Sequence, residues 1–209
     1  MDRNTAISRI QRGLGFRTDL NDEIALALQE QQRLLEQGKT LPKFMKEEDQ
    51  TISVVASTQS YFLPERFIRV SDEESVYWVD SDNVSHEIVR RPFAEARGYY
   101  SETDAGAPEA YSIRKDTIYF WPVPDTGYSV VWTYYKGGEL LTSNVENTWL
   151  ANVPDLLIGL AGISIATDVR DKDAFATFTA LAQAAAEAML NNVALDELSD
   201  MPVALGRNN

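Results

Sequence analysis

The stretch NTWLANVPDLL, residues 147–157, separates two parts of the chain that have different hydrophobic patterns. Before it, from about residue 50 to residue 138, apolar and polar residues alternate with the two-residue period of β-strands. After it, apolar residues recur at helical spacing and no further strand pattern is found. The stretch is therefore predicted to join a β-rich part of the protein to a helical part.

Three residues of this stretch are predicted to start a helix. Asn152 is a favoured N-cap, and Pro154 suits the first helical turn because its missing N–H needs no partner there. Asp155 favours the positive end of the helix. Trp149, Pro154 and Leu157 are our candidate structural joint, and we expect Trp149 and Leu157 to be core residues.

Helical patterns occur at both ends of the chain. A short one covers 4–12, and a stronger one begins at Thr18 or Asn21 and ends near Gln37. A third runs over 154–169, and a fourth is capped by Asp171 or Asp173. We expect an α+β protein in which these four helices form an antiparallel core.

The segment between the helices is predicted to be an inserted antiparallel β subdomain. Runs of β-branched and aromatic residues alternate with turn residues. The predicted domains are a helical domain of residues 1–49 and 139–195, a β subdomain of 50–138, and a C-terminal extension of 196–209. The expected strands are 51–55, 61–64, 67–70, 75–79, 85–89, 110–114, 117–121 and 128–135.

Composition excludes several classes of function. The 209 residues include no Cys, so disulfides, zinc–thiolate sites and thiol catalysis are excluded. A net charge of −13 disfavours groove-reading binding of nucleic acid, although it suits a passage through which DNA slides without sticking. Solubility alone is an alternative explanation of this charge.

The sequence contains little material for catalysis. His86 is the single histidine, and it lies in a strand pattern, where a surface or hydrogen-bonded residue is the commoner case. A calcium loop starting at Asp80 is rejected, because its sixth and twelfth positions are Ser85 and Arg91 rather than Gly and Glu. The acidic runs 47–49 and 72–74 offer carboxylates for a hydrolase, but both lie in predicted exposed turns. We therefore expect no enzyme, no cofactor and no metal site.

Several strings in a fixed order resemble a known family. YFLPERFIR at 61–69 is followed by PEAY at 108–111, IYFWPVPD at 118–125 and YY at 134–135, and then by NTWL and PDLL within 147–157. Together with the two N-terminal helices, this order is similar to the head-to-tail adaptors of short-tailed and related phages, also called connector or tail tubular A proteins. The resemblance covers about residues 4–195.

The resemblance implies a structural virion protein of the neck, made in the host bacterial cytoplasm. It implies a homo-oligomeric ring, typically dodecameric, between the portal protein and a tail protein of the nozzle or tail tube. DNA only passes through the channel of such a ring, and no membrane is involved. In the C-terminal extension, the candidate partner contacts are Met201, Val203, Leu205 and Arg207.

A carbohydrate-binding module is the main alternative function. Tyr119, Trp121, Tyr128 and Trp132 lie on predicted strands, where aromatic rings on one face can stack on sugars. Because such residues are more often core, we place this alternative second and the carboxylate hydrolase third.

Overall fold

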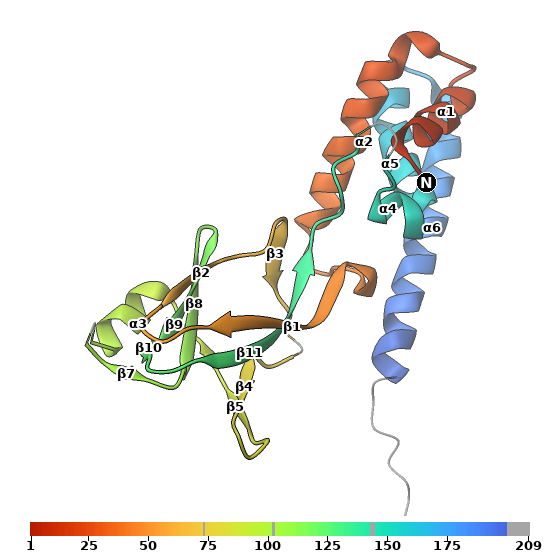
Figure 1. Ribbon diagram of the computed structural model, residues 1–209. Helices are drawn as coiled ribbons and strands as arrows, with labels where there is room; N and C mark the ends of the chain where they lie inside the picture. Colours follow the sequence, from red (N-terminus) through yellow and green to blue (C-terminus); the bar gives the residue numbers. More distant parts are fainter. Residues whose placement is uncertain (73, 102, 143–144, 200–209) are drawn as a thin grey trace, which may run out of the picture. The chain divides into compact units, whose positions relative to one another are not determined.

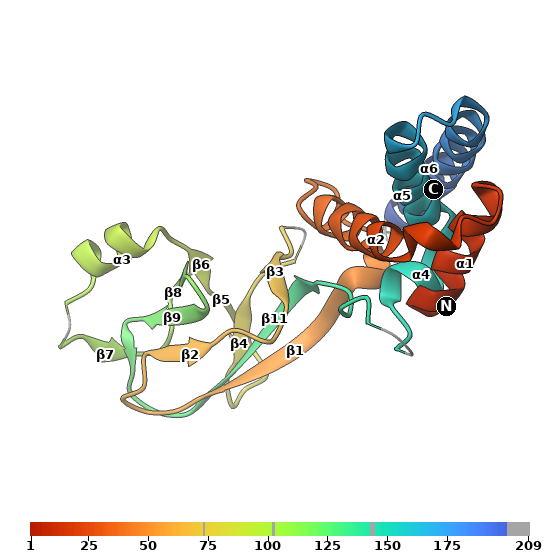
Figure 2. The same ribbon diagram turned by 90° about the horizontal axis from the view of Figure 1, so that it is seen from above.

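A computed structural model describes residues 1–72, 74–101, 103–142 and 145–199 of the chain (Figure 1). The chain divides into two compact units. One unit combines Met1–Met45 with Gly138–Asn209, and the other is Lys46–Gly137. The first is helical and the second contains the strands, as Figures 1 and 2 show.

Helix α5 is the centre of the helical unit, where it packs against α6, α2, α1 and α4. It is apolar around most of its circumference and buries residues on successive positions, including Leu156, Leu157 and Ile158. A helix that is apolar on all sides needs neighbours on all sides. The helices of this unit are α1 (Arg3–Gly13), η1 (Thr18–Leu20), α2 (Asn21–Glu36), η2 (Lys43–Met45), α4 (Thr148–Asn152), α5 (Pro154–Asp168) and α6 (Lys172–Ser199).

The predicted antiparallel four-helix core is wrong. In such a bundle each helix buries one stripe, whereas here α5 is surrounded and its neighbours differ greatly in length. Helix α1 has 11 residues and α6 has 28, so they cannot pair along their whole lengths. The mixed α and β composition agrees with the prediction, but the helices are arranged around one central helix.

The predicted cap of α5 is wrong, whereas one of the two predicted caps of α6 is found. Asn152 ends α4 and donates to the Thr148 carbonyl, and α5 follows Val153 with no side-chain cap. Asn147 instead caps α4, since its Oδ1 accepts from the Trp149 and Leu150 backbone N–H groups. The cap of α6 is Asp171, which is one of the two residues predicted for this role. Its Oδ1 accepts from the N–H groups of residues 173 and 174.

Small residues let α5 and α6 approach closely. A Cβ built on Gly159 would lie 2.8 Å from the backbone nitrogen of Ala182, and one on Gly162 would lie 2.4 Å from the Phe178 ring. Because 159 faces 182 and 162 faces 178, the two helices are antiparallel, joined by the three residues between Asp168 and Lys172. Figure 1 shows the C-terminal part of α6 running past the end of α5.

Within the described residues, the strands of the β unit form three sheets. The first has the order β1-β11-β4-β5, with β3 also paired to β11, and the second has the order β2-β9-β8-β6. Most pairs are antiparallel, but β10–β7 and β6–β8 are parallel, which the antiparallel prediction did not include. The strands are β1 (Lys46–Val54), β2 (Ser60–Phe62), β3 (Phe67–Val70), β4 (Tyr77–Val79), β5 (Ser85–Glu87), β6 (Val89–Arg90), β7 (Ala105–Gly106), β8 (Ala110–Arg114), β9 (Thr117–Trp121), β10 (Val123–Pro124) and β11 (Tyr128–Lys136).

The two larger sheets share one core. Ile118 and Phe120 from β9 join Val130 and Trp132 from β11 in a single buried cluster. Alternation along each strand puts these residues on one face. On the other face of the second sheet lies the short helix α3 (Phe93–Tyr99), whose Ala96 is fully buried against Ala110 and Trp121.

The close helix contact predicts opposite effects for two glycines. We expect Gly159→Ala to lower the free energy of unfolding by about 1–2 kcal/mol, because the overlap with the α6 backbone outweighs the gain in helix propensity. Gly98→Ala in α3 is the matched control, since nothing lies within 4 Å of a Cβ built on Gly98. It should be neutral or slightly stabilising. Urea unfolding of both variants checks this, and a stabilised Gly159→Ala would contradict the close packing.

The ends of the β unit predict that it can be removed. Lys46 pairs with Tyr135, so the first and last strands of the unit begin and end side by side. We expect a chain in which residues 46–137 are replaced by a short Gly/Ser linker to remain folded and mostly helical. Circular dichroism and thermal melting measure this, and an unfolded product would show that the helical unit is not a domain by itself.

Candidate functional site

His86 lies beside an acid but not in a catalytic arrangement. Its Nε2 is 2.8 Å from Asp80 Oδ2, and its ring stacks on Trp78 with 4.2 Å between centroids. Asp80 Oδ1 also accepts from the backbone N–H groups of Asp82 and Val84. The bond with His86 and these N–H groups hold the pKa of Asp80 below its usual value. The cluster therefore holds the β4–β5 connection together.

One residue of each acidic run, Glu74 and Glu47, lies in an ion pair. Lys46 Nζ lies 2.5 Å from Glu74 Oε1, and Thr133 donates to the other oxygen of the same carboxylate. Glu47 pairs with Lys136 at 3.7 Å. A glycosidase needs two carboxylates facing a substrate, whereas Glu47 and Glu74 each face a lysine. In the described part of the chain, no group of three or more His, Cys, Asp or Glu side chains could hold a metal ion.

The aromatic strand residues do not form an open platform. Trp121 and Trp132 are 3% and 2% exposed, so neither can stack on a sugar. Tyr128 is half-buried, and its hydroxyl donates to Asp125 at 2.6 Å. The pKa of Tyr128 is raised to about 12. Burial of the hydroxyl is the largest cause, and this hydrogen bond is the second. The four aromatic residues of the carbohydrate alternative are mainly packing residues.

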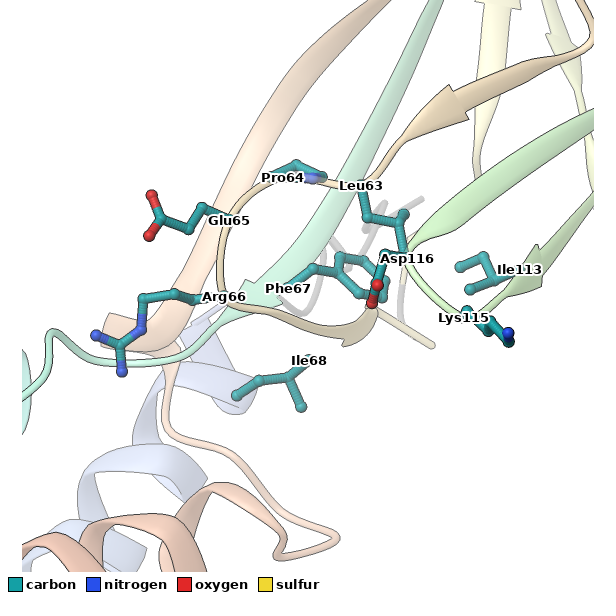
Figure 3. A pocket seen from close by; sticks show the side chains of 9 residues that line it. All are labelled: Leu63, Pro64, Glu65, Arg66, Phe67, Ile68, Ile113, Lys115 and Asp116. Atoms are coloured by element: carbon teal, nitrogen blue, oxygen red, sulfur yellow. The ribbon is translucent and has the colours of Figure 1, made fainter.

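A hollow of about 490 Å³ lies between the β2–β3 loop and the β8–β9 turn (Figure 3). Leu63 N donates to the Asp116 carbonyl and ties these two segments together. Figure 3 shows Glu65 and Arg66 pointing away from Lys115. The apolar lining residues are Leu63, Pro64, Phe67, Ile68 and Ile113, and the charged ones are Glu65, Arg66, Lys115 and Asp116. This lining carries charges of both signs around apolar side chains, as a protein contact surface does.

A second hollow, of about 420 Å³, lies in the helical unit between α1 and the start of α2. Its lining runs from Arg3 to Ala25 and is mostly polar.

No helix in the described residues is long and apolar enough to cross a bilayer.

The predicted joint lies in a buried hydrogen-bond network, which we call the re-entry network. Its members are Gln32 and Glu36 on α2, and Gly138, Asn147 and Trp149 where the chain returns from the β unit. Asn147 Nδ2 donates to Gln32 Oε1 at 3.1 Å, and Gln32 Nε2 donates to the Gly138 carbonyl at 3.1 Å. Glu36 Oε1 accepts from Trp149 Nε1 at 3.1 Å and from Gly138 N at 2.9 Å. Two distant segments are thus bonded to each other.

The three joint residues have different environments. Trp149 is 1% exposed, and its ring meets that of Phe44 edge-on at 5.4 Å. Leu157 is fully buried, and Pro154 is the first residue of α5. Their role as a link between the two parts of the chain stays a prediction. The candidate contacts Met201, Val203, Leu205 and Arg207 lie outside the described residues.

Sequence reasoning missed the α2 half of this network. The polar residues Gln29, Gln31, Gln32 and Arg33 predict a solvated or partner-facing flank, but Gln32 is 5% exposed within the chain itself. The spacing of Gln32 could have revealed its burial. Ile24, Leu28 and Gln32 follow each other at four-residue intervals and lie on the buried side of α2. A polar residue in an apolar stripe indicates a buried hydrogen bond.

The burial of Trp149 predicts a large loss of stability on truncation. We expect Trp149→Ala to lower the free energy of unfolding by about 3–5 kcal/mol, because a cavity forms and Glu36 loses a donor. Phe62→Ala is the control, since Phe62 is 89% exposed, and it should change stability by less than about 0.5 kcal/mol. Denaturant unfolding compares the two. A Trp149→Ala protein as stable as the control would reject this placement.

Comparison with known proteins identifies the family to which the chain belongs. A search among curated proteins gave no match. The family model described as SU10 adaptor protein matches residues 1–207, which is nearly the whole chain. The match agrees with the order of strings found in the sequence, and the predicted resemblance is confirmed. The chain belongs to the SU10 adaptor protein family, a family of phage head-to-tail adaptors.

Proposed function

We propose that this protein is a structural adaptor that forms a ring between the portal protein and the tail of a phage. The observation that carries the proposal is the family match over residues 1–207. In this role it binds other proteins and neither catalyses a reaction nor uses a cofactor. The two units, each with its own core, provide separate surfaces for neighbours. A dodecameric ring in the virion neck is the assembly proposed, from subunits made in the bacterial cytoplasm.

The charge of the protein supports a passive role toward DNA. A net charge of −13 at pH 7 repels a phosphate backbone, which binds tightly only to dense Lys and Arg surfaces. A channel wall that is acidic or of mixed charge lets DNA pass without being held. DNA is therefore proposed as cargo and the proteins on either side as partners.

The C-terminal residues are proposed to dock on the portal. Met201, Val203 and Leu205 are spaced two apart in a polar segment and offer apolar anchors, and Arg207 adds a cation. Helix α6 runs to Ser199, past the predicted start of the extension at residue 196. A cut after Ser199 removes the proposed anchors and leaves the helix intact.

Electron microscopy of the protein mixed with its portal tests this proposal. The full chain is expected to add a ring of density to one end of the portal, and the chain cut after Ser199 to remain folded without binding. The control is a full-length variant with Val84→Ala in the β unit, since Val84 is exposed and the anchors are kept. A full chain that never binds the portal contradicts the adaptor function. If the truncated chain binds the portal as well as the full chain does, only the proposed anchoring role of the C-terminal residues is rejected.

A further inference from the structure

The sheet β2-β9-β8-β6 has an outer face built from cross-strand rows. Phe62 on β2 pairs with Thr117 on β9, and Thr117 pairs with Arg114 on β8. Paired residues of neighbouring strands point to the same face of a sheet. The next rows contain Ser60 with Tyr119 and then Ala110 with Trp121. Each row therefore presents side chains to the same side.

Helix α3 covers only part of this face. Its Phe93 meets Tyr119 and Trp121 edge-on, at 4.8 and 5.8 Å between ring centroids. Phe62 stands at the β2 end of its row and is 89% exposed. We call Phe62, Phe93, Arg114, Thr117 and Tyr119 the outer-face patch.

The outer-face patch has the composition of a protein-binding hot spot. Aromatic residues and Arg are enriched at such centres. The Arg114 guanidinium lies 5.0 Å from the centre of the Phe93 ring, so its cation stands beside the aromatic surface. A matching partner carries an apolar side chain for Phe62 and a carboxylate for Arg114.

Helix α2 presents such a surface. Leu26 and Leu34 are 57% and 54% exposed, although the opposite side of the helix is buried against α5. The exposed acids Asp22, Glu23 and Glu30 flank these leucines. Asp22, Leu26, Glu30 and Leu34 follow each other at four-residue intervals and so form one stripe. We call these five residues the α2 stripe.

We infer that the outer-face patch of one copy binds the α2 stripe of the next copy. The inference rests on the proposed ring and names the surfaces that close it. One chain carries both halves, and cation and carboxylate are matched across them. In a chain of net charge −13, a copy-to-copy contact needs such local complementarity to offset general repulsion. Because the two surfaces differ, the contact is head-to-tail, and repeated contacts of that kind can close a ring.

The spacings of the two surfaces are compatible. Glu30 lies one turn beyond Leu26, which is about 6 Å along the helix. Phe62 and Arg114 are two strand spacings apart, which is about 10 Å. With Leu26 on Phe62, the long side chain of Arg114 spans the remaining few ångströms to Glu30.

Disulfide trapping in the full chain tests this interface. The protein has no Cys, so each introduced thiol is unique. One preparation carries Leu26→Cys, a second carries Phe62→Cys, and the two are mixed and oxidised. Val84→Cys replaces Phe62→Cys as control, because Val84 is exposed in the same unit but lies outside the patch. We expect heterodimers of 26 with 62 in at least about tenfold excess over 26 with 84, as for a contact at hot-spot level.

Charge reversal sharpens the test. Arg114→Glu in the Phe62→Cys background should lower the heterodimer yield, and Glu30→Arg in the Leu26→Cys background should restore it. All variants change exposed residues, so their melting temperatures should match the parent. Equal yields for 62 and 84 would overturn the interface. A single chain carrying both cysteines that closes an internal disulfide at high dilution would overturn the second copy as occupant.

Portal binding by the same preparations separates the two proposals. A chain that binds the portal but gives no selective 26–62 link rejects this interface and keeps the adaptor function. A chain that gives the link but does not bind the portal rejects the adaptor function and keeps the interface.

Discussion

The helical unit depends on the re-entry network, because the chain leaves this unit at Met45 and returns to it at Gly138. Two segments far apart in the sequence must meet in one register. Gln32 and Asn147 are both buried, and each satisfies the other at 3.1 Å. A buried amide without a partner costs about 1–3 kcal/mol, so any shift of one segment against the other is penalised. This bonding sets Trp149 and α4 beside α2, and α5 follows directly.

The central position of α5 follows from its composition. Few polar residues interrupt it, so each side needs a neighbour, and Gly159 and Gly162 admit α6 at very short range. In the β unit, alternation has the opposite consequence, because it gives each strand two different faces. One face of β9 enters the common core, whereas the other is covered only where α3 lies over it. Phe62, on the strand beside β9, is the most exposed large hydrophobic residue among those the structure describes.

These features suit a protein whose function is to bind other proteins. The only histidine is held between Asp80 and Trp78, and Glu74 and Glu47 of the acidic runs pair with Lys46 and Lys136. The surface also carries exposed large apolar side chains, among them Phe62, Leu26 and Leu34. In an adaptor, specificity then comes from matching such surfaces, and a strongly acidic net charge suppresses unmatched contacts.

Local patterns in the sequence were sufficient for most elements and for the family. The strands 67–70, 110–114 and 117–121 are confirmed at the predicted residues, because alternation and turn chemistry are properties of neighbouring residues. Three features were decided only by the tertiary structure: the burial of Gln32, the capping role of Asn147 rather than Asn152, and the arrangement around α5 in place of four equivalent helices. Each depends on partners from distant segments: Gln32 is bonded to Gly138 and Asn147, and α5 contacts helices from both ends of the chain. Periodicity shows which face of an element is apolar, but it does not show which distant segment will cover that face.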